Sequence, residues 1–312
     1  MKRRYWISLI LAAVMLAISV GGAIAEAQSD KPARPRVCIT NDGEIDDKNS
    51  FVHLLYYANE IDLVGLVQTS SFAHWAGSEN GPEVTWMTSK LGAYMGVPAS
   101  GQEAFAWPGT DWMNEFIDAY AELYPNLSAH DPRYPEPDAL KSVVKIGNIG
   151  YTGDMDEATE GSDFVKALIL DEINGDYDQP LYITAWGGLN TVGRALMDIQ
   201  AEYGDGAEWD AMLADIYAKV RIYLWYGQDW SADNTDPVLE DVIAPYYPEI
   251  TMVDVNACQA MGWSWANALT NGKHRIPEVM SGAWLRENID DGHGALLDWY
   301  VTDGDGTHVV DE

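Results

Sequence analysis

The order of apolar and polar positions predicts strands that alternate with helices along most of the chain. Runs typical of strands cover residues 37–40, 62–70, 180–185, 220–225 and 250–255, and residues 145–153 form a glycine-punctuated strand end. Segments with apolar residues at helical spacing cover residues 51–59, 82–95, 111–124, 163–173 and 191–203. This alternation predicts an α/β fold with a mostly parallel central sheet in an open, Rossmann-like arrangement and helices on both faces.

Capping and turn-forming residues set the expected limits of several elements. Pro125 is expected to end the helix at 111–124, and Ser162 is expected to cap the helix at 163–173. The acidic segment 233–236 should cap a further helix. Residues 100–109 and 128–138 are rich in proline, glycine and aromatic residues, so we expect long surface loops there.

The first residues have the parts of a secretory signal peptide. Residues 1–4 are basic after the initiator, residues 7–20 are apolar, and residues 23–25 read Ala-Ile-Ala, a small-x-small cleavage site. We therefore expect residues 1–25 to be removed and the protein to be periplasmic or secreted. The alternative is an uncleaved membrane anchor, because the apolar stretch is nearly long enough to span a bilayer. Residues 26–35 are polar with two prolines and predict a short disordered lead.

Charge and composition narrow the classes of partner. The formal net charge is −31, and loss of residues 1–25, which hold three basic and no acidic residues, would bring it to −34. Such an excess argues against nucleic acid or an anionic membrane surface as a partner. A hydrophobic content of 47% fits a globular chain with a sizeable core, and residues 36–312 suffice for one large α/β domain. A homo-oligomer is compatible with the sequence.

The two cysteines, Cys38 and Cys258, show no motif spacing. Export makes a disulfide between them possible, but Cys38 in a predicted strand is more typical of a small core residue. The chain has no Cys-x-x-Cys pair and no His-Glu-x-x-His, so the sequence gives no support for a zinc site.

Directly after the first predicted strand, four acidic residues lie within six positions: Asp42, Glu44, Asp46 and Asp47. Open α/β folds place their sites at the carboxyl ends of such strands. Neighbouring carboxylates repel each other unless a cation or a proton relieves them. A hard divalent cation, Ca²⁺ more than Mg²⁺, would do so. The alternative is a type I turn followed by a helix N-cap, because Asp and Asn favour both places.

The stretch Asn-Asp-Gly-Glu-Ile-Asp-Asp at 41–47 resembles the N-terminal aspartate signature of nucleoside hydrolases. It is more similar to a bacterial branch, the nucleoside-hydrolase-like domain of a family of cellulose-binding proteins. Further blocks of resemblance follow in family order: LVQTSSFAHW (66–75), GNIGY (147–151), AWGGLNT (185–191), GQD (227–229) and WLRENI (284–289). The resemblance covers most of the chain from Arg36 onward and implies a nucleoside-hydrolase-like fold for residues 36–312.

The resemblance also implies a chemistry, namely hydrolysis of N-glycosidic bonds in nucleosides or related small glycosides with Ca²⁺ as the cofactor. Asp42 matches the metal ligand that also takes a proton from the attacking water. Asp47 matches a second metal ligand, and the backbone carbonyl of Trp186 matches a third. The implied transition state resembles an oxocarbenium ion, which nearby carboxylates stabilise.

Several matching positions imply substrate contacts. Asp46 matches a residue that binds ribose hydroxyls. The loop that borders the sugar pocket offers His74 and Trp75 in this chain, and the alternative for His74 is a partly buried loop histidine. The later blocks add three polar candidates: Asn148, Gln228 and Asp229.

The chain also departs from the nucleoside-hydrolase pattern. Thr40 replaces an aspartate, and Gly43 and Glu44 replace a Pro-Gly pair. These changes are compatible with calcium binding, but no residues for recognition of a nucleobase are identifiable, so the nucleoside specificity is open.

The family's last metal aspartate is expected about where the chain stops. Either the chain is a fragment, or Asp303, Asp305 or Asp311 takes that role. Two functions of different class follow from these features: a secreted calcium-dependent hydrolase of nucleosides or related small glycosides, and a protein that binds cellulose or another polysaccharide without turnover. A truncated domain with neither activity is the third alternative.

Overall fold

The computed structural model describes residues 33–78, 104–105, 107–225, 227–230, 235–254 and 282–300. The chain divides into two units, residues 1–34 and residues 35–312. Every helix and strand that the structure describes lies in the second unit. Several predictions lie outside the described residues: the signal peptide, most of the lead, the helix at 82–95, Cys258, and the aspartates at 303, 305 and 311.

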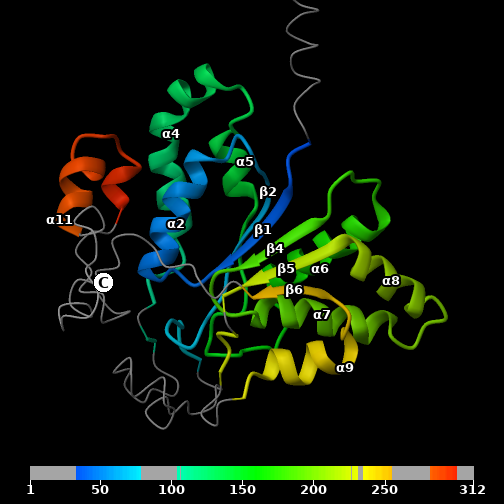
Figure 1. The fold of residues 1–312 in the computed structure, drawn as a ribbon. Helices are drawn as coiled ribbons and strands as arrows, with labels where there is room; N and C mark the ends of the chain where they lie inside the picture. The colour runs from blue at the N-terminus through cyan, green and yellow to red at the C-terminus, as the bar shows by residue number, and fades with distance from the viewer. Residues whose placement is uncertain are drawn as a thin grey trace, which may run out of the picture. The chain divides into compact units, whose positions relative to one another are not determined.

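Six parallel strands form the sheet in the described part of the chain, and each corresponds to a predicted strand (Figure 1). They are β1 (Arg36–Asn41), β2 (Asp62–Gln68), β3 (Val144–Ile146), β4 (Leu181–Ala185), β5 (Val220–Leu224) and β6 (Thr251–Asp254). Their order is β3-β2-β1-β4-β5-β6, with every neighbouring pair parallel. Strands β2 and β3 follow β1 towards one edge of the sheet, and β5 and β6 follow β4 towards the other edge. A topological switch point therefore lies between β1 and β4.

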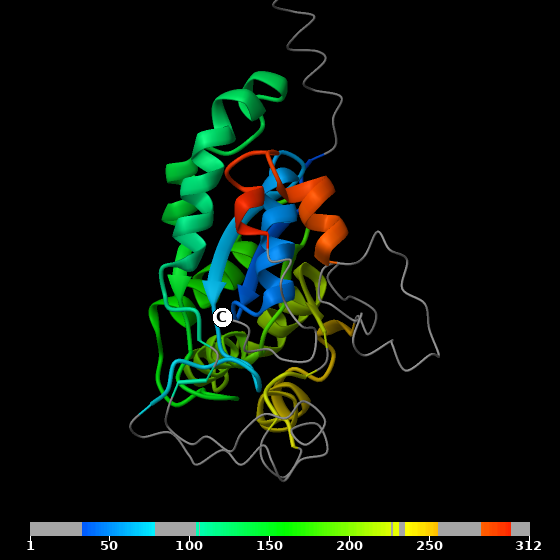
Figure 2. The same ribbon diagram turned by 90° about the vertical axis from the view of Figure 1, so that its left-hand side faces the viewer.

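Helices cover both faces of the sheet, as predicted (Figure 1). Val37 and Ile39 of β1 point towards the face covered by α2 and α4, whereas Cys38 points towards the face covered by α6, α7 and α8. Figure 2 shows α2 and α4 in front of the sheet, next to the segment from α11 to η5. The helices are α2 (Ile45–Tyr56), α4 (Trp112–His130), α5 (Pro137–Ser142), α6 (Glu160–Asn174), α7 (Asn190–Tyr203), α8 (Trp209–Lys219), η2 (Val238–Ile243), α9 (Ala244–Tyr246), α11 (Gly282–Leu285), η4 (Arg286–Asp290) and η5 (Leu297–Trp299).

Cys38 is a core residue, as its predicted strand position indicated. Its side chain is buried between β1 and α6, and burial raises the pKa of its thiol to about 12. The thiol therefore stays protonated at neutral pH.

The first helix begins earlier than predicted, at Ile45 instead of residue 51. Asp46 and Asp47 consequently lie in its first turn and not in a loop. An acidic first turn is favoured by the helix dipole, and this preference outweighs the polar character that marked the segment as a turn.

The helix α4 continues through Pro125 to His130, so the prediction that Pro125 ends it was wrong. Leu123 and Tyr124 before the proline and Leu127 after it pack against the same core. Partial burial of these side chains, each worth up to about 2 kcal/mol, offsets the roughly 3 kcal/mol cost of a proline inside a helix. The predicted loop at 128–138 is correspondingly shorter, because α4 and α5 take up both of its ends.

The helix α6 begins one turn earlier than predicted, and Ser162 is not its N-cap residue. Thr159 takes that position, and its hydroxyl accepts a hydrogen bond from the Ser162 amide at 3.1 Å. The Ser162 hydroxyl in turn accepts from the Thr159 amide at 2.8 Å, which completes a capping box. Asp236 does cap the segment that follows it, as predicted, because its Oδ1 accepts from Val238 and Leu239 amides at 3.0 Å each.

The helix α8 was not predicted from the sequence. Among the described residues, no helix combines the length and the apolar character that a bilayer span requires.

Replacement of the α6 cap should lower the stability of the domain. Thr159→Ala removes the hydroxyl that accepts from Ser162, and we expect a loss of about 1 kcal/mol in the free energy of unfolding. Thr159→Ser keeps the hydroxyl and should retain most of that free energy. Urea denaturation followed by circular dichroism measures both variants, and equal losses for the two would contradict a capping role.

Candidate functional site

The acidic stretch after β1 folds into a tight loop that leads directly into α2. The Asn41 side-chain oxygen accepts from the Gly43 amide at 2.8 Å, and Asp42 Oδ1 accepts from the Glu44 amide at 3.1 Å. Gly43 has a φ of 81°, in the left-handed region that glycine adopts most readily. The N-cap residue Glu44 makes no side-chain capping bond to the helix. The alternative of an ordinary turn and N-cap therefore explains the hydrogen bond of Asp42 Oδ1. It does not explain the other carboxylate oxygens of the cluster.

The carboxylates of this loop and of the first turn of α2 repel each other. Asp42 and Asp47 are buried, and burial, followed by the charge of Asp42, raises the pKa of Asp47 well above its usual value. The same two causes raise the pKa of Asp46 to about 7. Asp42 Oδ2 and Asp46 Oδ1 are buried without a hydrogen-bond partner among the described residues. A buried oxygen without a hydrogen-bond partner lowers the stability of the folded state. A bound cation would reduce the repulsion between the carboxylates and would interact with these unsatisfied oxygens.

A histidine from the neighbouring loop joins these carboxylates. His74 follows β2, is fully buried, and has its Nδ1 at 3.9 Å from Glu44 Oε2. One ligand atom each from Asp42, Glu44 and His74 lie within 4.8 Å of one another. This buried Asp/Glu/His group could hold a metal ion. It differs from the predicted ligand set, since Glu44 was not among the candidate ligands and His74 was a candidate for substrate contact.

The loop after β4 packs directly against Asp42, on the other side of the switch point. The Trp186 amide donates to the Thr40 carbonyl at 2.8 Å. A Cβ atom on Gly187 would lie 2.8 Å from the Asp42 Cβ, so only glycine allows this approach. The loop that holds the predicted carbonyl ligand is therefore adjacent to Asp42. The Trp186 carbonyl also accepts a hydrogen bond from the Gln228 side-chain amide, which fixes its orientation and leaves it a second lone pair.

Asn190, at the start of α7, ties the loops of three strands together and was missed in the sequence analysis. Its side-chain amide donates to Ser70 Oγ at 3.0 Å and to the carbonyls of Asn148 and Asp154 at 2.8 and 3.0 Å. Its oxygen accepts from the Thr69 hydroxyl at 2.6 Å. An asparagine two residues after the Gly187-Gly188 pair is the signal in the sequence that could have indicated this role.

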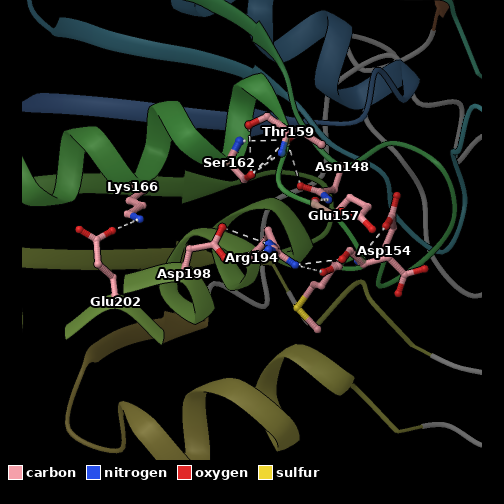
Figure 3. A network of polar contacts seen from close by, with 11 residues as sticks. Asn148, Asp154, Glu157, Thr159, Ser162, Lys166, Arg194, Asp198 and Glu202 are labelled. Atoms are coloured by element: carbon pink, nitrogen blue, oxygen red, sulfur yellow. Dashed lines mark hydrogen bonds and ion pairs between the residues drawn. The ribbon is translucent and has the colours of Figure 1, made fainter. Parts of the chain in front are cut away.

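The side chain of Asn148 is used to order the loop between β3 and α6 (Figure 3). Its amide donates to the Glu157 carbonyl at 2.9 Å, and its oxygen accepts from the Thr159 hydroxyl at 3.1 Å. Arg194 of α7 secures the same loop through the Asp156 carbonyl at 3.0 Å. Asn148 thus lies near the predicted site, but its polar atoms bond within the protein.

Asp229 and Trp75, two further candidates for substrate contact, also bond or pack within the protein. Asp229 Oδ2 accepts a hydrogen bond from the Leu189 amide at 2.6 Å. Leu189 is the N-cap residue of α7 and has no side chain that could cap the helix, so the Asp229 carboxylate, which follows β5, caps it instead. Trp75 is fully buried and stacks on Phe105, with ring centroids 4.8 Å apart. Asn148, Asp229 and Trp75 thus bond or pack within the protein, whereas the carboxylates at 42–47 and His74 form a largely buried polar group.

Comparison with known families agrees with this arrangement. A family model described as "Cellulose-binding Sde182, nucleoside hydrolase-like domain" matches residues 36–310. The chain belongs to this family. The Sde182 nucleoside hydrolase-like domain includes every described strand and every candidate site residue except Asp311.

A solved structure supports the fold of this Sde182-type domain. It is that of a nucleoside hydrolase-related hypothetical protein from Saccharophagus degradans, described as associated with carbohydrate metabolism. The sequence identity is 25%, the TM-score is 0.58, and the match covers 88% of this chain and 53% of that one. This chain thus spans about half the length of that protein. No curated protein matches the chain. The α/β, nucleoside-hydrolase-like fold predicted from the sequence is confirmed.

The buried Asp229 should make stability depend on pH. Burial, followed by the charge of Asp236, raises the pKa of Asp229 well above its usual value. Folding therefore favours the protonated form of Asp229. The contribution of this residue to the free energy of unfolding is largest below the unfolded-state pKa of about 4 and is lost as the pH rises through the folded-state pKa. Asp229→Asn cannot ionise, and the fall in melting temperature from pH 5 to pH 8 should be smaller than in the wild type.

Thermal denaturation at several pH values measures this difference. The exposed Asp205 provides a control, because Asp205→Asn removes the same charge at the surface. A pH profile of Asp229→Asn that parallels those of the wild type and the control would exclude ionisation of Asp229 as a source of the dependence.

Proposed function

We propose that this domain is a metal-dependent hydrolase that cleaves the N-glycosidic bonds of nucleosides or related small glycosides. The observation that carries the proposal is the buried carboxylate cluster after β1, in which Asp42 Oδ2 has no hydrogen-bond partner among the described residues. An acceptor of this kind at the carboxyl end of a central strand is placed to take a proton from a reacting group.

The donor set fits a calcium ion. Asp42, Asp47 and the backbone carbonyl of Trp186 would hold it, because Ca²⁺ prefers carboxylate and carbonyl oxygens. The repulsion that raises the pKa values of Asp46 and Asp47 is the kind that a divalent cation removes. Bound calcium would make an attacking water more acidic and would orient two sugar hydroxyls.

The side chains of the chain itself supply the remaining steps. Asp42 Oδ2 accepts the proton of the attacking water, while its Oδ1 stays fixed by the Glu44 amide. Asp46 binds sugar hydroxyls through its buried, unbonded Oδ1. As the glycosidic bond breaks, its electron pair leaves with the nitrogen of the departing group, which takes up a proton from solvent. Positive charge develops on the sugar, and carboxylates already in place stabilise it without rearrangement.

A carbohydrate-binding role without turnover is the second candidate. Asn148, Gln228 and Asp229 hold the loops in place through bonds to the backbone, so the frame would persist without catalysis. The name of the family, with cellulose binding in it, favours this candidate as well. Cellulose or another polysaccharide would then be the ligand. With either candidate, we propose that residues 1–25 direct export to the periplasm or the medium.

Turnover with a nucleoside panel tests the first candidate. The wild type with calcium should release free base and ribose from at least one purine or pyrimidine nucleoside. Asp42→Asn keeps the shape of the side chain and removes the proton acceptor, so kcat should fall at least about a hundredfold. The exposed Asp178 offers the matched control, and Asp178→Asn should retain wild-type kcat.

Two results would decide against hydrolysis. One is an Asp42→Asn variant as active as the wild type. The other is a folded wild type that releases no base from any nucleoside of the panel in the presence of calcium. Co-sedimentation of that inactive protein with cellulose would establish the carbohydrate-binding alternative.

A further inference from the structure

The group of Asp42, Glu44 and His74 has a ligand chemistry of its own. Calcium takes oxygen ligands, whereas an imidazole nitrogen suits zinc, cobalt, nickel and iron. Two carboxylates and one imidazole within 4.8 Å of one another are thus a donor set for a borderline transition metal. Three protein ligands would leave a position open, as catalytic zinc sites do.

Distances and burial fit such a site. Nδ1 of His74 and Oε2 of Glu44 are 3.9 Å apart, which is longer than an N–H···O hydrogen bond. Two atoms that each lie about 2.1 Å from one ion are at most about 4.2 Å apart, so the His74–Glu44 separation is within reach of one ion, and a ligand pair as far apart as 4.8 Å would close by about 0.6 Å on binding. His74 and Asp42 are fully buried, and Glu44 is buried as well.

An independent observation marks the place of a ligand. The Glu44 amide holds Oδ1 of Asp42, and Oδ2 remains without a hydrogen-bond partner among the described residues although the whole side chain is inaccessible to solvent. This oxygen belongs to Asp42, whose carboxylate lies close to the ligand atoms of Glu44 and His74. A metal ion bound between the three residues would coordinate it.

The loop that carries His74 is held in position before any ion binds. Ser71 Oγ accepts from the Ala73 and His74 amides at 3.0 and 3.2 Å, and the Ser71 amide donates to the His74 carbonyl at 2.9 Å. The Phe72 amide donates to the Gln228 carbonyl at 2.8 Å. Ordered ligands of this kind lose little entropy on binding.

We propose that Asp42, Glu44 and His74 bind one divalent transition metal ion, of the zinc and cobalt type, next to the calcium position. The inference rests on the proposed function in one respect, since Asp42 is a ligand in both positions. The sequence contains no zinc motif because these ligands come from two separate loops, which the parallel pairing of β1 with β2 brings together.

Cobalt binding tests the proposal without reference to turnover. Metal-free wild-type protein should bind one Co²⁺ per chain and show visible d–d absorption from a site with nitrogen and oxygen ligands. His74→Ala and Glu44→Gln should each weaken Co²⁺ binding at least about tenfold, because loss of even an outer partner of a metal ligand has an effect of that size. His130, exposed at the end of α4, is the control, and His130→Ala should bind as the wild type does.

A second measurement covers the case in which His74→Ala does not fold, as judged by circular dichroism. Proton NMR of the Co²⁺-loaded wild type should show a shifted, exchangeable imidazole N–H signal that disappears in Glu44→Gln at equal metal concentration. Wild-type protein that binds no Co²⁺, or a folded His74→Ala with unchanged affinity and spectrum, would overturn the site. Neither readout depends on nucleoside hydrolysis, so the absence of turnover would reject the proposed function alone.

Discussion

Repulsion between buried carboxylates at the end of β1 is the constraint on which the rest of this structure depends. A short loop and the first turn of α2 bring together Asp42, Glu44, Asp46 and Asp47, where water cannot screen their charges well. The first turn of α2 offsets part of the repulsion, because backbone amides and the helix dipole face the acids. The repulsion that remains is reflected in the raised pKa values of Asp46 and Asp47, and Asp42 Oδ2 stays without a hydrogen bond. This residual repulsion would be the source of any affinity for a cation.

The order of the strands explains why the carboxylates and the loops around them lie at one edge of the sheet. Strands β1 and β4 lie side by side at the switch point, so the loops that follow them meet above the same edge of the sheet. Gly187 lets the second loop approach Asp42 closely, and Asn190 fastens it to the loops after β2 and β3. The rigidity of the frame comes from these hydrogen bonds, whereas the acids and His74 supply the buried ionisable groups.

Much of the fold could be predicted because the local signals agree with the tertiary structure. Buried parallel strands carry apolar residues on both faces, and the central strands β1, β4 and β5 appear in the sequence as largely apolar runs. Pro125 shows where local reasoning fails, since the packing of α4 on both sides of it outweighs the proline. The acidic loop was predictable from four charges close in sequence. The pairing of Glu44 with His74, and the capping of α7 by Asp229, depend on contacts between distant segments and have no local signal.

The pairing of β1 with β4 also determines when the site can form. Arg36 of β1 lies opposite Leu181 of β4, so more than half of the described chain separates two neighbours in the sheet. Contacts of such long range require closure of a large loop, which slows folding. A nascent chain exposes Asp42 long before Gly187 and Asn190 have been synthesised. The two halves of the sheet must therefore join before one ion can be held by both Asp42 and the Trp186 carbonyl, and the binding free energy of such an ion would stabilise the completed domain.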